Sequence, residues 1–317
     1  MNIVMLEPLD VPRAYLDDLL APLIKQGHQV VACHEALTDA QKQERVADAQ
    51  ALIIANGKLG EELLSHARQL QYISVAFTGT DHLDKKACER RGIKVSNASG
   101  YSTLDVAELT IALTISLLRS ILPADARVRA QQIKAGLPAN RLHGKTVGII
   151  GTGAIGLRAA ELFRAFGCEL LATSRTEHSQ AKALGMKYVP LDVLLRESDI
   201  VSLHTPLTEE TRHLIGEDQL AMMKKTAVLI NCARGAVVDT AALAKALNAG
   251  DIAGAAFDVF ENEPPIAADH PLLHARNALL TPHIAFYTKE SMKDRAVVAI
   301  DNVTQWLDGK HVRPVAL

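Results

Sequence analysis

The stretch 145–175 reads KTVGIIGTGAIGLRAAELFRAFGCELLATSR, and it decides the fold. Its first part, 145–150, is a short apolar, β-branched run that predicts a buried parallel strand. A G-x-G-x-x-G spacing follows at once, then a helical pattern, then a second strand at 168–173. Strand, glycines, helix and second strand in this order predict a dinucleotide-binding βαβ unit.

Each glycine of this spacing has a separate physical task. Gly151 makes the tight turn, and Gly153 lets the backbone approach a pyrophosphate. Gly156 lets the helix pack closely on the strand, so that the helix N-terminus faces the anion. The alternative is a purely structural turn between strand and helix.

The end of the second strand indicates which dinucleotide is bound. An NAD site usually has a carboxylate there for the ribose 2′-OH, but this chain has Ser174, Arg175 and Thr176 after Thr173. A hydroxyl followed by a guanidinium suits a 2′-phosphate, so NADP(H) is favoured. The alternative is that Arg175 is a solvated surface charge and the site takes NAD(H).

Length and composition limit the class of protein. The 317 residues suggest two α/β domains, and a net charge of −2 without blocks of like charge gives no reason to expect nucleic acid. The four cysteines form neither CxxC nor a metal-ligand spacing, so we expect free thiols, no metal and a cytoplasmic location. No signal segment starts the chain, and the apolar run 109–118 is too short to cross a membrane.

The first hundred residues repeat a strand–helix rhythm without a glycine fingerprint. The loop 76–81 contains Gly79, which would let consecutive N–H groups bind a carboxylate; the alternative is a plain turn capped by Asp81.

A mostly apolar helix is expected over 106–121, either buried between domains or at a subunit interface. A long final helix and an exposed tail, 313–317, end the chain.

After the fingerprint, each predicted strand is followed by a polar cluster. These clusters are His204–Thr208, Cys232–Gly235, Asp258–Pro265 and Thr281–His283. Ligands of open α/β sheets bind outside the carboxyl ends of the strands. We therefore expect these clusters to form one site.

The clusters contain the groups that a nicotinamide enzyme acting on a carbonyl needs. His283 would move the proton, because imidazole is the side chain best suited to proton transfer at physiological pH, and Glu263 would hold its other ring nitrogen and favour the charged form. Arg234 would hold a carboxylate and a carbonyl oxygen. The alternatives are that Arg234 is a surface cation, that Glu263 lies in a solvated acidic loop and that His283 is a loop histidine. His204 is expected to be structural or to line the cofactor site.

The segments GTGAIG, HTPLT, NCARGAVVD, AAFDVFENEPP and TPHIAFYT together closely resemble the D-isomer-specific 2-hydroxyacid dehydrogenase family. Order and spacing match over nearly the whole chain. The resemblance implies an α/β protein of two Rossmann-like, doubly wound parallel-sheet domains with the active site in the cleft between them. Residues 1–98 with 287–317 would form the substrate-binding domain, and 99–286 the dinucleotide-binding domain.

The resemblance also implies residue roles. Arg234 would bind substrate carboxylate and carbonyl, His283 would be the acid/base, and Glu263 its partner. The backbone of Thr78 and Gly79 would hold the carboxylate, with Tyr101 near the substrate. The expected cofactor-lining residues are Gly151, Gly153, Ala154, Ile155, Gly156, Ser174, Arg175, Thr176, Thr205, Pro206, Thr211, Cys232, Ala233, Asp258 and Val106. Members are commonly homodimers through the helix that matches 106–121.

The resemblance implies a small 2-oxo acid as the substrate, and we expect glyoxylate, hydroxypyruvate or pyruvate. Tyr101 and the stretch 286–288 are similar to D-lactate and D-2-hydroxyisocaproate dehydrogenases, whereas 174–176 resembles NADP-linked glyoxylate and hydroxypyruvate reductases. A D-3-phosphoglycerate dehydrogenase-like enzyme is one alternative. An NAD(H)-sensing corepressor-like interaction protein is the alternative from another class.

Overall fold

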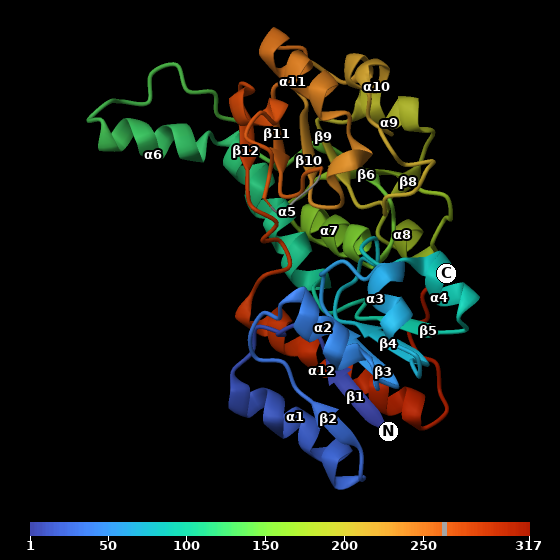
Figure 1. Cartoon of the computed structure of the whole chain (residues 1–317). Helices are drawn as coiled ribbons and strands as arrows, with labels where there is room; N and C mark the ends of the chain where they lie inside the picture. Colours follow the sequence, from blue (N-terminus) through green and yellow to red (C-terminus); the bar gives the residue numbers. More distant parts are fainter. Residues whose placement is uncertain (262–264) are drawn as a thin grey trace. The chain divides into compact units, whose positions relative to one another are not determined.

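A computed structural model describes residues 1–261 and 265–317, and the chain divides into two compact units. The first unit is Met1–Ser102 with Tyr287–Leu317, and the second unit is Thr103–Phe286. Each unit has a parallel sheet with helices on both faces (Figure 1). The prediction of two Rossmann-like α/β domains is confirmed.

The first unit has a five-stranded sheet of order β2-β1-β3-β4-β5, in which every pair is parallel. Its elements are β1 (Asn2–Met5), α1 (Arg13–Lys25), β2 (Gln29–Val31), α2 (Asp39–Val46), β3 (Ala51–Ile54), α3 (Glu61–His66), β4 (Tyr72–Val75), α4 (Lys85–Arg90), β5 (Lys94–Asn97) and α12 (Lys289–Leu307). Helices α2, α3 and α4 cover one face of the sheet, and α1 and α12 cover the other.

Helix α12 joins the first unit although it comes last in the chain. The hydroxyl of buried Tyr72 on β4 donates to the carbonyl of Asn302 at 3.1 Å, and its ring stacks on Trp306 with centroids 4.8 Å apart. Burial raises the pKa of Tyr72 to about 12. The C-terminal helix is therefore part of the core of this sheet.

The C-terminal tail is largely exposed, as expected, but its backbone is paired. Val315 N donates to Val95 O and Asn97 N donates to Arg313 O, so the tail pairs with the edge strand β5. The Arg313 guanidinium also donates to Asp301 and Asn302 of α12. This pairing was not expected because an apolar pattern alone does not show that an edge strand has unpaired backbone groups to satisfy.

The second unit has a seven-stranded parallel sheet of order β12-β11-β10-β9-β6-β7-β8. Its elements are α5 (Thr103–Leu118), α6 (Ile121–Arg129), β6 (Thr146–Ile150), α7 (Ala154–Ala165), β7 (Glu169–Thr173), α8 (Ser179–Ala183), β8 (Lys187–Tyr188), α9 (Leu191–Glu197), β9 (Ile200–Leu203), α10 (Glu217–Met222), β10 (Val228–Asn231), the 3₁₀ turn η1 (Gly235–Val237), α11 (Thr240–Ala249), β11 (Gly254–Phe257), η2 (Pro271–His274) and β12 (Ala278–Leu280). Helices α5, α7 and α8 cover one face, and α9, α10 and α11 the other.

The apolar helix expected over 106–121 is α5, and it begins and ends three residues earlier. Ser120 follows it with φ of +50°, a left-handed conformation that ends one helix before α6 begins. Ala107, Ile111 and Leu113 of α5 belong to the core that also contains α7. Much of its apolar character is therefore used inside its own unit.

Within the described ranges, no single helix has the length and apolarity to cross a membrane. Helices α5 and α6 meet that criterion only as a pair, by length and composition, and they are bent by 59°.

Candidate functional site

The glycine-rich turn after β6 has the geometry that its spacing predicts. Gly151 has φ of +96°, and a Cβ there would lie 2.6 Å from the carbonyl oxygen of His204. A Cβ on Gly156 would lie 2.0 Å from the carbonyl oxygen of Gly151. Around Gly153 a Cβ would meet nothing within 4 Å. Two positions thus exclude a side chain, and the third leaves open space at the N-terminus of α7.

The loop after β9 lies against this turn. Because β6 stands between β9 and β7, the strand order reverses beside Gly151, where doubly wound sheets bind ligands. The Thr205 methyl would lie 3.1 Å from a Cβ on Gly151, and the Thr205 hydroxyl is buried with no hydrogen-bond partner among the described residues. Thr211 donates to the carbonyl of Pro206 at 2.7 Å, which closes the same loop.

His204 at the end of β9 is a neutral structural group. Its Nε2 lies 2.9 Å from the hydroxyl of Ser202. Desolvation lowers the pKa of His204 to about 4. A histidine that is neutral at pH 7 and faces the glycine-rich turn places no cation there, in agreement with a structural role.

The segment after β7 contains no carboxylate at the position where NAD sites usually have one. Ser174 is half-buried, and Arg175 and Thr176 are exposed. Glu177 pairs with Lys182 of α8 at 2.6 Å, so this carboxylate is directed to α8. The groups available to a ribose here are therefore hydroxyls and a guanidinium.

Buried Asn231 shapes the turn that carries Arg234. Its side chain accepts from Ala233 N at 3.0 Å and donates to Arg234 O at 2.9 Å. A Cβ on Gly235 would lie 2.2 Å from the carbonyl carbon of Phe260 and 2.6 Å from Glu261 N. The glycine thus brings the Arg234 turn against the segment that follows β11. Burial raises the pKa of Cys232 to about 12, which keeps its thiol protonated.

Asp258 holds the loop that carries His283. The carboxylate is fully buried and accepts from the Thr281 hydroxyl at 2.5 Å, from Ile284 N at 2.9 Å and from Ala285 N at 2.8 Å. Burial raises the pKa of Asp258, while these hydrogen bonds and the nearby His283 act in the opposite direction. His283 itself has φ of +54°, an unusual conformation for a non-glycine residue that the surrounding hydrogen bonds maintain.

The expected partner of His283, Glu263, lies outside the described residues, as do Asn262 and Pro264. The preceding carboxylate, Glu261, accepts from the Thr240 hydroxyl at 3.3 Å and lies 3.5 Å from His213 Nε2. Glu261 is thus occupied with α11 and the loop before α10.

Three expected substrate residues belong to the first unit. Thr78 and Gly79 follow β4, and the carbonyl of Thr78 accepts from the Asn97 side chain at 2.7 Å. Tyr101 is buried and meets Phe77 edge-on, with centroids 6.1 Å apart. Buried Arg295 of α12 lies 5.1 Å from the centre of the Phe77 ring. The loop therefore rests on an aromatic and cationic layer.

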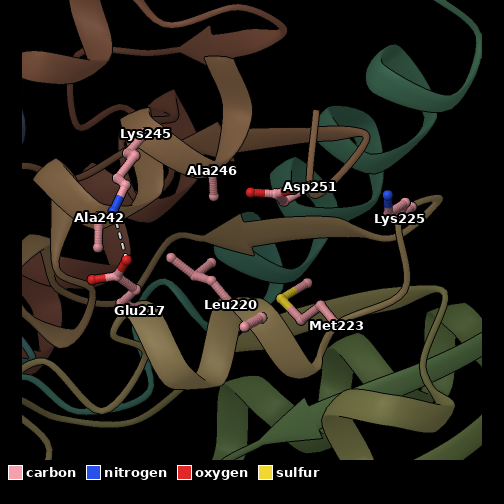
Figure 2. A pocket seen from close by; sticks show the side chains of 9 residues that line it. Glu217, Leu220, Met223, Lys225, Ala242, Lys245, Ala246 and Asp251 are labelled. Atoms are coloured by element: carbon pink, nitrogen blue, oxygen red, sulfur yellow. Dashed lines mark hydrogen bonds and ion pairs between the residues drawn. The ribbon is translucent and has the colours of Figure 1, made fainter. Parts of the chain in front are cut away.

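A cavity of about 280 Å³ lies elsewhere on the second unit. Figure 2 shows Leu220, Met223, Ala242 and Ala246 at this cavity, with Glu217 paired to Lys245 at its edge. Its remaining residues include Lys225, before β10, and Asp251, before β11. These are the amino ends of the strands, opposite to the edge that carries the expected site, so we assign this cavity no part in cofactor binding.

The expected residues of the second unit gather at one edge of its sheet. Those after β6, β7, β9, β10, β11 and β12 follow strand ends that lie side by side, and Val106 is buried in the first turn of α5. The sequence pattern placed Thr281 in an expected cluster without a role and did not single out Asn231 or Tyr188, whose side chains also hold these loops. The only available signal was their position at strand ends. In the described ranges no group of three His, Cys, Asp or Glu is placed to hold a metal ion.

These residues fit a dinucleotide. Open space at Gly153 lies beside the N-terminus of a twelve-residue helix, and an unpartnered buried hydroxyl at Thr205 lies beside Gly151. A helix N-terminus with approachable amides favours a pyrophosphate.

Comparison with known proteins places the chain in one family. The model for the D-isomer-specific 2-hydroxyacid dehydrogenase NAD-binding domain matches residues 111–285. A glyoxylate reductase of Aeropyrum pernix is 43% identical over 275 residues, which cover 84% of this chain and 82% of that protein.

Solved structures agree with this placement. The D-lactate dehydrogenase of Aquifex aeolicus, complexed with NAD and lactic acid, has a TM-score of 0.84 at 32% identity and covers 98% of this chain and 96% of its own. An acyclic imino acid reductase in complex with NADPH and D-Arg has a TM-score of 0.89 at 26% identity and covers all of both chains. The chain therefore belongs to the D-isomer-specific 2-hydroxyacid dehydrogenase family and is an oxidoreductase that uses a nicotinamide cofactor.

Proposed function

We propose that this enzyme reduces glyoxylate, hydroxypyruvate or pyruvate to the D-2-hydroxy acid, with NADPH as its preferred reductant. One observation carries the proposal: buried Asp258 fixes the His283 loop at the same sheet edge as the glycine-rich turn and Arg234. A proton donor, a carboxylate-binding cation and an open anion site then belong to one edge of one sheet.

The acid/base role is assigned to His283. In reduction, the protonated imidazole donates its proton to the developing alkoxide oxygen of the substrate. Arg234 binds the substrate carboxylate and polarises its carbonyl through two parallel donors. Glu263 is proposed to hold the second ring nitrogen of His283 and to favour the charged imidazole.

The cofactor is assigned to the glycine-rich turn. Gly151, Gly153 and Gly156 would hold the pyrophosphate with Ala154 and Ile155 at the helix N-terminus, and Ser174, Arg175 and Thr176 would hold the 2′-phosphate. Thr205, Pro206, Thr211, Cys232, Ala233, Asp258 and Val106 are proposed to line the remainder of the site. When bound, the reduced nicotinamide supplies the hydride.

The first unit is proposed to act on the substrate. The backbone amides of Thr78 and Gly79 would donate to its carboxylate, and Tyr101 would contact the substrate. We propose the first unit, Met1–Ser102 with Tyr287–Leu317, as the substrate-binding domain and Thr103–Phe286 as the dinucleotide-binding domain, so the first boundary lies four residues after the expected one at 98/99. The guanidinium of buried Arg295 lies 5.1 Å from the centre of the Phe77 ring, next to Thr78 and Gly79 in the same loop.

The test is the loss of reduced-nicotinamide absorbance, with NADPH and NADH measured separately against glyoxylate, hydroxypyruvate, pyruvate and 2-oxoisocaproate. We expect NADPH to be oxidised fastest, with one of the first three acids. A preference for NADH would contradict the assignment of Arg175. Cofactor binding without oxidation of any acid would favour a phosphorylated substrate or a sensing protein.

Two variants test the roles in catalysis. His283→Ala should lose at least a hundredfold in kcat and keep its affinity for NADPH, because general acid catalysis contributes 10²–10⁴-fold. Arg234→Ala should raise KM for the 2-oxo acid and lower kcat together. Normal turnover by either variant would overturn that assignment.

We also propose a homodimer in the cytoplasm. No residue of α6 is buried, and Ile121, Leu122 and Val128 are 49%, 58% and 73% exposed. Light scattering should give twice the chain mass, and joint replacement of Leu122 and Val128 by Asp should give monomers; a monomeric parent protein would contradict the proposal. The four cysteines are free, which supports a reducing compartment.

A further inference from the structure

The hydroxyl of Tyr188 joins two segments of the cofactor site that are distant in sequence. Tyr188 ends β8, at the edge of the sheet, and pairs with Ala172 of β7. Its hydroxyl lies 2.9 Å from the hydroxyl of Thr152, inside the glycine-rich turn. The same oxygen accepts from His178 N at 3.0 Å. One phenol therefore links the turn after β6 to the segment after β7.

Tyr188 accepts from the backbone N–H of His178, and the Thr152 hydroxyl lies 3.5 Å from the carbonyl of Thr176, at the outer limit of a hydrogen bond. At 2.9 Å, either hydroxyl of the Thr152–Tyr188 pair can be the donor. Thr152 is 1% exposed, so water does not compete for its bonds.

These bonds act on the backbone that carries Ser174, Arg175 and Thr176. Thr176 O faces the Thr152 hydroxyl, and His178 N donates to the Tyr188 hydroxyl. The carboxylate of Glu177, between them, pairs with Lys182 of α8 at 2.6 Å. The segment 174–178 is thus fastened at three successive residues. Arg175 is exposed, so its direction depends on this backbone and on the nearby carboxylate of Glu210 rather than on packing of its own side chain.

We propose that Tyr188 is a positioning residue for cofactor choice, which holds 174–178 in the shape that presents Ser174 and Arg175 to a 2′-phosphate. This inference rests on the proposed NADPH preference. NADH has no 2′-phosphate, and its pyrophosphate is proposed to meet the backbone of the 151–156 turn, whereas the Tyr188 link engages only the side chain of Thr152 in that turn. Loss of the phenol oxygen should therefore weaken NADPH binding selectively.

The test is Tyr188→Phe, with kcat and KM measured for NADPH and NADH at a saturating level of the same 2-oxo acid. We expect KM for NADPH to rise about five- to tenfold, as for loss of one or two hydrogen bonds. KM for NADH should change less than twofold, and kcat should be kept with both. An equal change in both KM values, or none, would overturn the inference.

Two further variants separate positioning from general damage. Thr152→Val removes the hydroxyl that meets Tyr188 at almost constant shape and should reproduce the selective rise in KM; it also serves if Tyr188→Phe does not fold. The double variant should lose no more than either single one. Tyr15→Phe, on α1 of the first unit, is the matched control and should change neither KM.

Arg175→Ala distinguishes failure of this inference from failure of the proposed function. If Arg175→Ala leaves the ratio of the two KM values unchanged, or the parent enzyme prefers NADH, the NADPH assignment fails and the Tyr188 inference fails with it. If Arg175→Ala abolishes the preference and Tyr188→Phe does not affect it, only the role of Tyr188 is wrong.

Discussion

The two units carry different residues after corresponding strands of their sheets. In each sheet the order reverses at a central strand, β1 in the first unit and β6 in the second. After β6 the chain reads Gly151-Thr-Gly153 and enters the twelve-residue helix α7. After β1 it reads Leu6-Glu7-Pro8, and α1 begins only at Arg13. The same architecture thus carries a glycine-rich turn in the second unit and a carboxylate in the first.

That carboxylate binds the backbone amides at its switch point. Glu7 accepts from Ala55 N at 2.6 Å and from Gly57 N at 3.1 Å, both of the loop after β3. In the second unit, the loop after β9 instead has the unpartnered hydroxyl of Thr205, and Gly153 faces open space. In the first unit the Glu7 carboxylate occupies the amides at the switch point, whereas in the second unit the corresponding position is open to an external anion. A shared fold therefore does not imply a shared ligand.

The largest effect is expected from a substitution in the glycine-rich turn of the second unit. Gly156→Ala would place a Cβ 2.0 Å from the Gly151 carbonyl oxygen, which cannot move without opening the turn. We expect NADPH affinity to fall more than a hundredfold and the second unit to lose about 3 kcal/mol of stability. Titration of NADPH fluorescence measures the first, and urea unfolding followed by circular dichroism the second. Unchanged affinity would contradict the glycine-rich turn as the cofactor site.

A matched pair of serines sharpens the comparison. Gly153 and Gly60 are both N-cap residues without a side-chain cap, before α7 and α3, and a Cβ on either meets nothing within 4 Å. Serine should supply the missing cap and add a few tenths of a kcal/mol at both sites. Gly153→Ser should nevertheless weaken NADPH binding about tenfold or more, whereas Gly60→Ser should not change it. Equal affinities in the two variants would show that no ligand approaches Gly153.

Removal of the internal anion tests the first unit. Glu7→Ala leaves two amides without their acceptor and should cost about 2 kcal/mol of stability. Trp306, the single tryptophan, belongs to the first unit, so its fluorescence during urea unfolding reports this loss. Glu7→Gln keeps one acceptor oxygen and should cost less. A change in KM for NADPH would contradict the separation of the two turns.

Acid should destabilise the second unit by a smaller amount. Burial lowers the pKa of His204 to about 4, and it also lowers the pKa of His270 in the same unit. A neutral buried histidine contributes stability above its unfolded pKa of about 6.5, and this contribution is lost as the pH falls towards 4. Because residue His204 is half-buried rather than fully buried, we expect a loss of about 1–2 kcal/mol.

His204→Gln is the corresponding variant. It should flatten the decline of stability between pH 6.5 and 4 in urea unfolding followed by circular dichroism. A decline of the same steepness in parent and variant would exclude His204 as its source.

Several features could be predicted because they depend on neighbours in sequence. The G-x-G-x-x-G turn is a matter of local sterics, so Gly151 and Gly156 were placed correctly by spacing alone. Alternation of strands and helices predicted parallel sheets, and parallel strands bring their carboxyl ends to one edge. The gathering of the clusters around Arg234, Asp258 and His283 at one edge follows from that rule.

What the sequence by itself determined is thus the order of the elements, the glycine-rich turn and the sheet edge that carries polar side chains. Only the tertiary structure decided that Glu7 binds amides near residue 55, that Tyr188 reaches Thr152, and that Asp258 holds the His283 loop. These bonds join residues 26 to 48 positions apart, and their formation depends on strand register and loop closure to within a few tenths of an ångström. Periodicity predicts which face a residue occupies, but it contains no information on which distant donor will meet it there.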